Sequence, residues 1–175
     1  TTPTPIQQQA LGPVLARRDM LGLAQTGTGK TAAFALPTVQ HLMATGATGR
    51  PRALIIAPTR ELAEQINEFV RTVIAGTPLR SLSVYGGVGK PGQVERIRRG
   101  VDLIVACPGR LLDLLNDRVV DLGGIDTLIL DEADHMFDKG FLPDIRRILR
   151  QVPKKRQTLV FSATMPAEIR HLAEE

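Results

Sequence analysis

Short apolar runs alternate with longer amphipathic stretches along the chain. The runs are almost continuously apolar, which is typical of strands buried on both faces, and they occupy 20–23, 52–57, 81–85, 102–106, 127–130 and 157–161. Apolar residues at helical spacing lie before and between them and predict helices at about 5–16, 32–44, 61–75, 93–99, 110–116, 142–151 and from 166 onward. The alternation predicts a single α/β domain over residues 1–175, a parallel sheet with helices on both faces.

Unusual polar or glycine-rich residues follow nearly every predicted strand. The strands end near Ala24, Ala57, Tyr85, Ala106, Leu130 and Phe161. In open parallel sheets, ligands bind beyond the carboxyl ends of the strands. This shared placement predicts one binding edge and is stronger support than any single motif.

A glycine-rich turn joins the first strand to the next helix. It consists of Ala24, Gln25, Thr26, Gly27, Thr28, Gly29, Lys30 and Thr31. A turn of this kind that ends in Lys-Thr is typical of a phosphate-binding loop, although the general pattern begins with Gly where this chain has Ala24. Lys30 supplies a charge for the outer phosphates, and the Thr31 hydroxyl is a ligand for Mg²⁺. The alternative is a glycine turn that merely ends a strand.

Carboxylates directly follow the strand at 127–130. Asp131 stands at the sheet edge, where a phosphate-loop protein holds Mg²⁺. Glu132 beside it is a candidate for orienting or deprotonating an attacking water. The alternative makes Asp131, Glu132 and Asp134 ordinary acidic residues in the first turn of a helix.

Gln7 has two possible roles. It lies three residues after Thr4, so it can complete a capping box at the start of the predicted N-terminal helix. Its amide can also donate and accept at once, as the N6/N7 edge of adenine requires. The spacing alone favours the cap.

Two arginines, Arg60 and Arg110, follow strand ends and open helices. Gly86 and Gly87, and Gly109 beside Arg110, have no side chains, so a ligand can reach the backbone there. Together they predict a surface that follows the phosphates of a nucleic acid. The alternative is Thr59 as a helix cap, solvated arginines and ordinary turn glycines.

Composition narrows these possibilities. The 175 residues are 43% hydrophobic, which allows a substantial core, and the net charge of +4 is compatible with nucleic acid. Only 3% are aromatic, so a nucleic acid would be held by its backbone rather than by stacking. No run is long enough to cross a membrane, and no signal peptide is visible. The single cysteine, Cys107, favours a reducing, cytoplasmic location.

Taken in order, the motifs resemble the first RecA-like domain of a DEAD-box RNA helicase, with the bacterial branch expected. The matching segments are 4–7 (TPIQ), 24–31 (AQTGTGKT), 58–63 (PTRELA), 86–87 (GG), 108–110 (PGR), 131–134 (DEAD) and 162–164 (SAT). The resemblance covers essentially the whole chain and implies a RecA-like P-loop NTPase fold. Ala24 is the usual residue at its position in that family.

The resemblance implies roles for individual residues. Gln7 would contact adenine, the segment from Ala24 to Thr31 would bind the phosphates of ATP, Asp131 would bind Mg²⁺, and Glu132 would act on water. The residues that would lie on the RNA backbone are Pro58, Thr59, Arg60, Gly87, Pro108, Gly109 and Arg110. The residues that would couple the nucleotide state to RNA binding are Ser162 and Thr164, partly through Asp134.

Three departures from the family pattern affect these expectations. The aromatic residue that packs on adenine upstream of Gln7 is not in this sequence, and Cys107 stands where Thr is common. No segment resembles the second RecA-like domain, which would supply arginine fingers and half of the RNA site. We therefore expect this chain to be the ATP-binding half of a helicase; a nucleotide-binding module without turnover would use the same residues.

Overall fold

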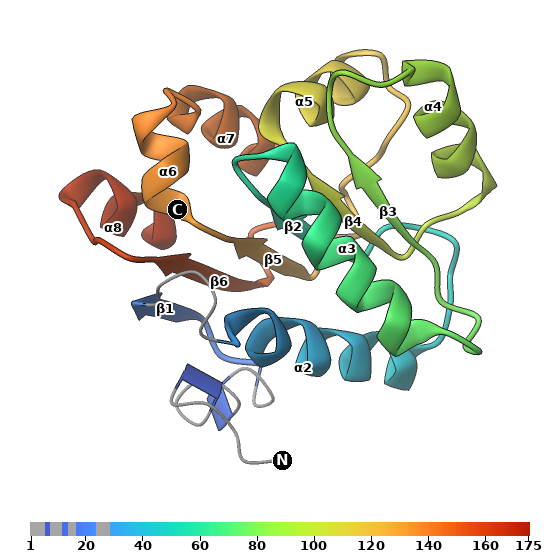
Figure 1. Ribbon diagram of the computed structural model, residues 1–175, viewed down its shortest axis with the longest axis horizontal. Coiled ribbons are helices and arrows are strands. Elements are labelled where there is room, and N and C mark those ends of the chain that lie inside the picture. Colours follow the sequence, from blue (N-terminus) through green and yellow to red (C-terminus); the bar gives the residue numbers. More distant parts are fainter. Residues whose placement is uncertain (1–5, 8–11, 14–16, 24–28) are drawn as a thin grey trace.

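Strands and helices alternate in the computed structural model, which describes residues 6–7, 12–13, 17–23 and 29–175 (Figure 1). The strands are β1 (Met20–Leu23), β2 (Ala53–Ile56), β3 (Ser81–Val84), β4 (Leu103–Ala106), β5 (Thr127–Leu130) and β6 (Gln157–Ser162). The helices are α2 (Lys30–Thr45), α3 (Arg60–Ile74), α4 (Lys90–Arg99), α5 (Pro108–Asn116), α6 (Ala133–Asp138), α7 (Leu142–Leu149) and α8 (Ala167–Glu174).

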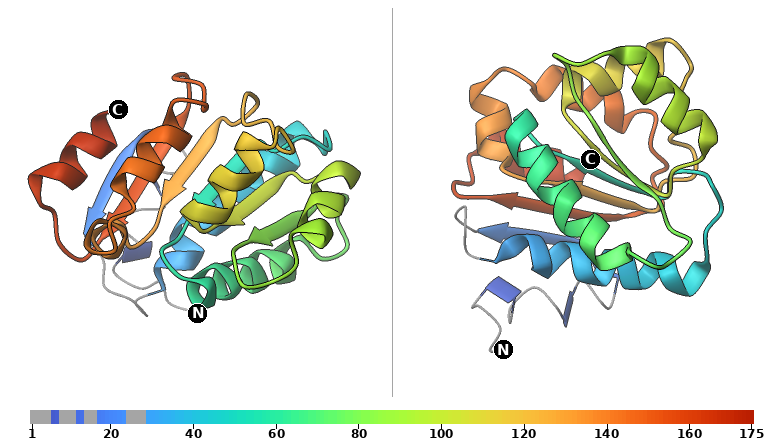
Figure 2. Two further views of the ribbon diagram at one scale, coloured as in Figure 1. Left: turned by 90° about the horizontal axis from the view of Figure 1, so that it is seen from above. Right: turned by 45° about the vertical axis from the view of Figure 1, so that its right-hand side comes forward.

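All six described strands form one parallel sheet in the order β1-β6-β5-β2-β4-β3. Helices cover both of its faces (Figure 2), because parallel neighbours need crossover connections. The predicted fold class is therefore confirmed.

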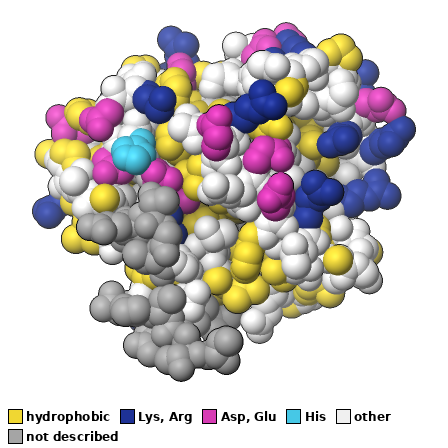
Figure 3. Space-filling view, viewed as in Figure 1, with side chains coloured by type: hydrophobic (Ala, Val, Ile, Leu, Met, Phe, Trp, Pro, Cys, Tyr) yellow, Lys and Arg dark blue, Asp and Glu magenta, His cyan; other side chains and the backbone are white. Residues whose placement is uncertain are grey.

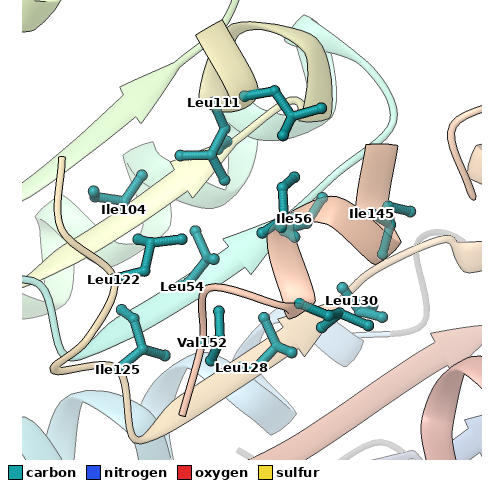
Figure 4. Packing of buried hydrophobic residues seen from close by; sticks show 14 of the residues in the cluster. Leu54, Ile56, Ile104, Leu111, Leu122, Ile125, Leu128, Leu130, Ile145 and Val152 are labelled. Carbon is teal, nitrogen blue, oxygen red and sulfur yellow. The ribbon is translucent and has the colours of Figure 1, made fainter. Parts of the chain in front are cut away.

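Two hydrophobic layers hold the helices on the sheet. Leu54 and Ile56 of β2 face a layer that includes Leu111 of α5 and Ile145 of α7 (Figure 4). Ile55, between them in sequence, faces the opposite layer, formed with α2 and α3. Because successive strand residues point to opposite faces, an all-apolar strand serves both layers at once.

Several helix boundaries differ from the prediction. α4 begins at Lys90 and α5 at Pro108, a few residues early, since proline is well suited to the first turn of a helix. A helix after β5 was predicted only in the alternative for the acidic residues, because the six residues of α6 are too few for a clear periodicity; Asp134 does lie in its first turn. Of the predicted N-terminal helix, 6–7 and 12–13 are helical, and its other residues lie outside the described part of the chain.

The strand order divides the carboxyl edge of the sheet into two parts. β1, β6 and β5 are neighbours, so the segments that follow them meet on one side. The segments that follow β2, β4 and β3 meet on the other side. Within the described residues, the helices are too short or too polar to cross a membrane.

Candidate functional site

A buried ion pair lies at the part of the sheet edge that follows β1, β6 and β5. Lys30 is the first residue of α2, and its Nζ lies 3.0 Å from Oδ1 of Asp131, which directly follows β5. Only 3% of Lys30 and none of Asp131 is exposed. Gly29 precedes the helix with φ 77°, a left-handed conformation that glycine adopts without strain. The sequence therefore placed Lys30 and Asp131 correctly at one edge.

Burial shifts the pKa of Asp131. Desolvation raises the pKa of its carboxyl, the nearby Lys30 ammonium opposes the shift, and Glu132 adds to it. Lys30 is thus the main group that opposes the rise, since a buried charge without a partner is costly.

Asp131 and Thr31 fit a magnesium ion. The Oδ2 atom of Asp131 is buried and has no hydrogen-bond partner among the described residues, a position suited to a cation or its water ligands. Thr31 is half-buried in the first turn of α2 and can offer its hydroxyl. The described residues contain no group of three or more His, Cys, Asp or Glu that could hold a metal. Mg²⁺ usually keeps several waters, so one or two protein ligands suffice.

Glu132 has an unusual backbone. Its φ of 53° and ψ of 52° are left-handed, which is uncommon for a residue other than glycine and typical of functional sites. Its N–H donates to Asp131 Oδ1 at 3.0 Å. Its Oε2 lies 3.9 Å from Lys30 Nζ, so the second carboxylate faces the same ammonium as Asp131.

Asp134 joins the end of β5 to the end of β6. Its backbone N–H donates to the Ser162 hydroxyl at 3.1 Å, and the Thr164 hydroxyl donates to its Oδ2 at 3.3 Å. Burial would raise the pKa of Asp134, but hydrogen bonds from Ser162, the His135 backbone and Thr164, with the charge of His135, hold it below its usual value. Asp134, Ser162 and Thr164, predicted as a coupling group, therefore lie in direct contact.

Gln7 contacts the phosphate-loop region. Its Nε2 donates to the Gly29 carbonyl at 3.0 Å and ties the N-terminal segment to the start of α2. This contact differs from both sequence-based roles for Gln7. Thr4, the cap candidate, and Ala24, Gln25, Thr26, Gly27 and Thr28 of the loop lie outside the described residues.

Arg60 lies at the part of the sheet edge that follows β2, β4 and β3. The Thr59 side chain caps α3 by accepting the Leu62 N–H at 3.2 Å, as predicted, and Arg60 begins the helix. The Arg60 guanidinium lies over the Tyr85 ring, 5.0 Å from its centroid. A Cβ added to Gly87, whose φ is 84°, would meet Arg60 Nη1 at 3.6 Å.

Arg110 lies at the same part of the sheet edge, near the start of α5 and after the neighbouring strand β4. Its Nη1 donates to the Gln93 side chain at 3.0 Å and to the Val88 carbonyl at 3.3 Å. Gln93 in turn donates to the Tyr85 carbonyl at 3.0 Å. A Cβ added at Gly109 would meet nothing within 4 Å, so its backbone is open to a ligand.

Comparison with known proteins decides the family. A model described as DEAD/DEAH box helicase matches residues 4–172, nearly the whole chain. The chain belongs to the DEAD/DEAH box helicase family.

Relatives of this helicase-family chain come from distant organisms. It is 45% identical to DEAD-box ATP-dependent RNA helicase 52A of Oryza sativa subsp. japonica over 99% of the chain and 32% of the relative. It is 46% identical to ATP-dependent RNA helicase CshA of Listeria monocytogenes over 98% of the chain and 32% of the relative. The chain thus spans about a third of the length of these curated relatives. The plant and bacterial relatives match at similar identity, so the expected bacterial branch stays a prediction.

A solved structure supports the RecA-like helicase fold. A hypothetical ATP-dependent RNA helicase from Sulfolobus tokodaii superposes with a TM-score of 0.88 at 38% identity, over 99% of this chain and 50% of that one.

The predicted site residues of this helicase-family domain form two groups. One group lies around the ends of β1, β5 and β6 and brings together Gln7, Gly29, Lys30, Thr31, Asp131, Glu132, Asp134, Ser162 and Thr164. The other group gathers Thr59, Arg60, Gly87, Gly109 and Arg110, whereas Pro58 and Pro108 are buried and shape the turns without presenting side chains to solvent.

Sequence reasoning missed three residues that contact these groups. Tyr85 and Gln93 hold the two arginines, and His135 contacts Glu132. For Tyr85 a signal existed, since it is the chain's only tyrosine and directly precedes the predicted glycine pair.

Proposed function

We propose that this chain is the ATP-binding half of an ATP-dependent RNA helicase. The observation that carries the proposal is the buried pair of Lys30 and Asp131, with Glu132 facing the same ammonium, at the carboxyl edge of a parallel sheet. The relatives named as ATP-dependent RNA helicases support the choice of ATP and RNA.

Lys30 is the residue that nucleotide binding would change most. It pairs with Asp131 in this structure, and the outer phosphates would take over its ammonium. When bound, Mg²⁺ neutralises charge on the phosphates. Thr31 and Asp131 would hold it, and Gln7, already attached to Gly29, would face the adenine.

Glu132 would act on the attacking water. Its Oε2 faces Lys30, and therefore the site where the outer phosphate would lie. A carboxylate in this place can orient the water or accept its proton.

The surface that carries Arg60, Gly87 and Arg110 would bind the RNA backbone. Arg60 and Arg110 lie on adjacent segments and match phosphate oxygens with planar guanidinium groups. Ser162 and Thr164, which contact Asp134, would transmit the nucleotide state to this surface.

We further propose that a second RecA-like domain completes the helicase, because the chain covers half of the similar Sulfolobus tokodaii chain. The single cysteine supports the proposed cytoplasmic location.

ATP hydrolysis, measured with and without RNA, tests the proposal. The 175-residue chain should hydrolyse ATP negligibly, because an arginine finger from another domain contributes roughly 10³–10⁵ in rate. A longer version with the second domain should show RNA-stimulated hydrolysis that Glu132→Gln abolishes. If the longer version binds ATP but never hydrolyses it, the chain is a binding module and not half of an enzyme.

A further inference from the structure

His135 lies beside the carboxylate proposed to act on water. Its Nδ1 is 2.7 Å from Oε1 of Glu132, three residues earlier. A carboxylate oxygen only accepts hydrogen bonds, so Nδ1 carries the proton in this contact. The Glu132 side chain is 13% exposed and that of His135 54%, so the contact lies at the open rim of the site.

The two oxygens of Glu132 face different groups. Oε1 accepts from His135, and Oε2 faces Lys30 at 3.9 Å. An imidazole that holds one oxygen fixes the direction of the other. The oxygen directed at the ammonium is the one on the side where phosphates would bind.

The backbone makes such a fixed direction useful. The left-handed conformation of Glu132 directs its side chain away from the path of an ordinary helical residue. Its N–H is bound to Asp131, but the side chain still has rotatable bonds that this contact does not restrict. A displacement of about 1 Å in a catalytic group can cost on the order of 100-fold in rate.

His135 is itself held by the neighbouring coupling group. Its backbone N–H donates to Asp134 Oδ1 at 3.1 Å, while Oδ2 of the same carboxylate accepts from Thr164. The backbone from which the imidazole projects is therefore held in place at the start of α6.

We propose that His135 is a positioning residue for Glu132, whose Nδ1–H holds Oε1 so that Oε2 stays directed at the nucleotide phosphates. This role rests on the proposed function. The chain offers a control in His171 of α8, whose Nδ1 lies 3.9 Å from Oε2 of Glu174, three residues later, with both side chains exposed. That pair is a surface contact without a role in the site.

Nuclear magnetic resonance of the histidine rings tests the hydrogen bond in the 175-residue chain without any hydrolysis. Long-range ¹H–¹⁵N spectra at alkaline pH, where imidazoles are neutral, distinguish which nitrogen carries the proton. We expect His135 to be protonated at Nδ1 and to change to Nε2 in Glu132→Ala. A neutral His135 already protonated at Nε2 in the unmodified chain would overturn the proposal.

Steady-state kinetics of the longer, two-domain protein tests the role. His135→Ala should lower kcat about 10-fold and leave the KM for ATP within about 2-fold. His135→Asn places an amide N–H near the position of Nδ1 and should recover most of kcat, and His171→Ala should match the wild type. The proposal is wrong if His135→Ala retains full kcat, raises KM instead, or is not rescued by Asn. An unmodified protein that fails to hydrolyse ATP contradicts the proposed function, whereas normal turnover in His135→Ala contradicts only the role of His135.

Discussion

Replacing Lys30 by methionine should destabilise the chain in a pH-dependent way. The substitution keeps the length of the side chain but removes the ammonium 3.0 Å from the buried Asp131 carboxylate. Removing one partner of a buried ion pair typically costs about 3–5 kcal/mol, because the remaining charge has no compensation. This range is the expected loss in the free energy of unfolding at pH 8.

The pH dependence follows from the direction of the Asp131 shift. Burial raises its folded pKa above the unfolded value, so the folded state binds more protons and stability falls as pH rises from that unfolded value through the folded pKa. Without Lys30 the folded pKa rises further, which extends this window upward. The loss caused by Lys30→Met should therefore be smaller at pH 5, where more Asp131 is protonated.

Urea unfolding followed by circular dichroism at pH 5 and pH 8 measures both effects. Lys155→Met, an exposed position, is the control and should change stability by no more than about 0.5 kcal/mol. Adding Asp131→Asn to Lys30→Met should recover much of the lost stability, since the uncompensated charge is gone. A loss below about 1 kcal/mol at pH 8, or an equal loss at both pH values, would refute the reasoning.

Three further predictions concern other parts of the site. Burial, with a contribution from Glu61, raises the pKa of Cys107 from 9.0 to about 11. Iodoacetamide should therefore label Cys107 about 100-fold more slowly at pH 8 than an unperturbed thiol, and labelling at the unperturbed rate would contradict this. Tyr85→Leu should weaken RNA binding by the two-domain protein about 2- to 5-fold in a fluorescence titration, because Arg60 loses its cation–π contact. Tyr85→Phe keeps the ring and is the control; an equal loss of binding in that variant would argue against the contact. Ser162→Ala should cost about 1–3 kcal/mol in thermal unfolding, because the Asp134 N–H loses its acceptor; unchanged stability would mean that water replaces the hydroxyl.

The alternation of apolar runs and amphipathic segments was enough to predict the parallel sheet and the edge at which the candidate site residues lie. It could not predict which segments meet there, because the sheet is not assembled in sequence order. Lys30 and Asp131 are 101 positions apart (131 − 30) and meet only because β1, β6 and β5 are neighbours. The family resemblance supplied that information, and spacing alone did not.

Local geometry was the other part that the sequence did not reveal. A left-handed glutamate cannot be read from a sequence pattern, since only glycine is common there. The contact between Gln7 and Gly29 was missed for a related reason. An amide side chain has donors and an acceptor that can pair with many groups, and spacing suggested only its nearest partner, the helix cap.

The central claim is that Lys30 pairs with Asp131 until nucleotide phosphates replace Asp131 as the partner of its ammonium. Isothermal titration calorimetry of the 175-residue chain with ADP tests this claim most directly. We predict Mg²⁺-dependent binding with a Kd at or below about 1 mM, weaker binding of GDP, and loss of binding in a Lys30→Met variant shown to be folded. Lys155→Met should bind like the wild type. ADP binding of equal affinity in the folded Lys30→Met variant, or the absence of any binding by the unmodified chain, would contradict the account.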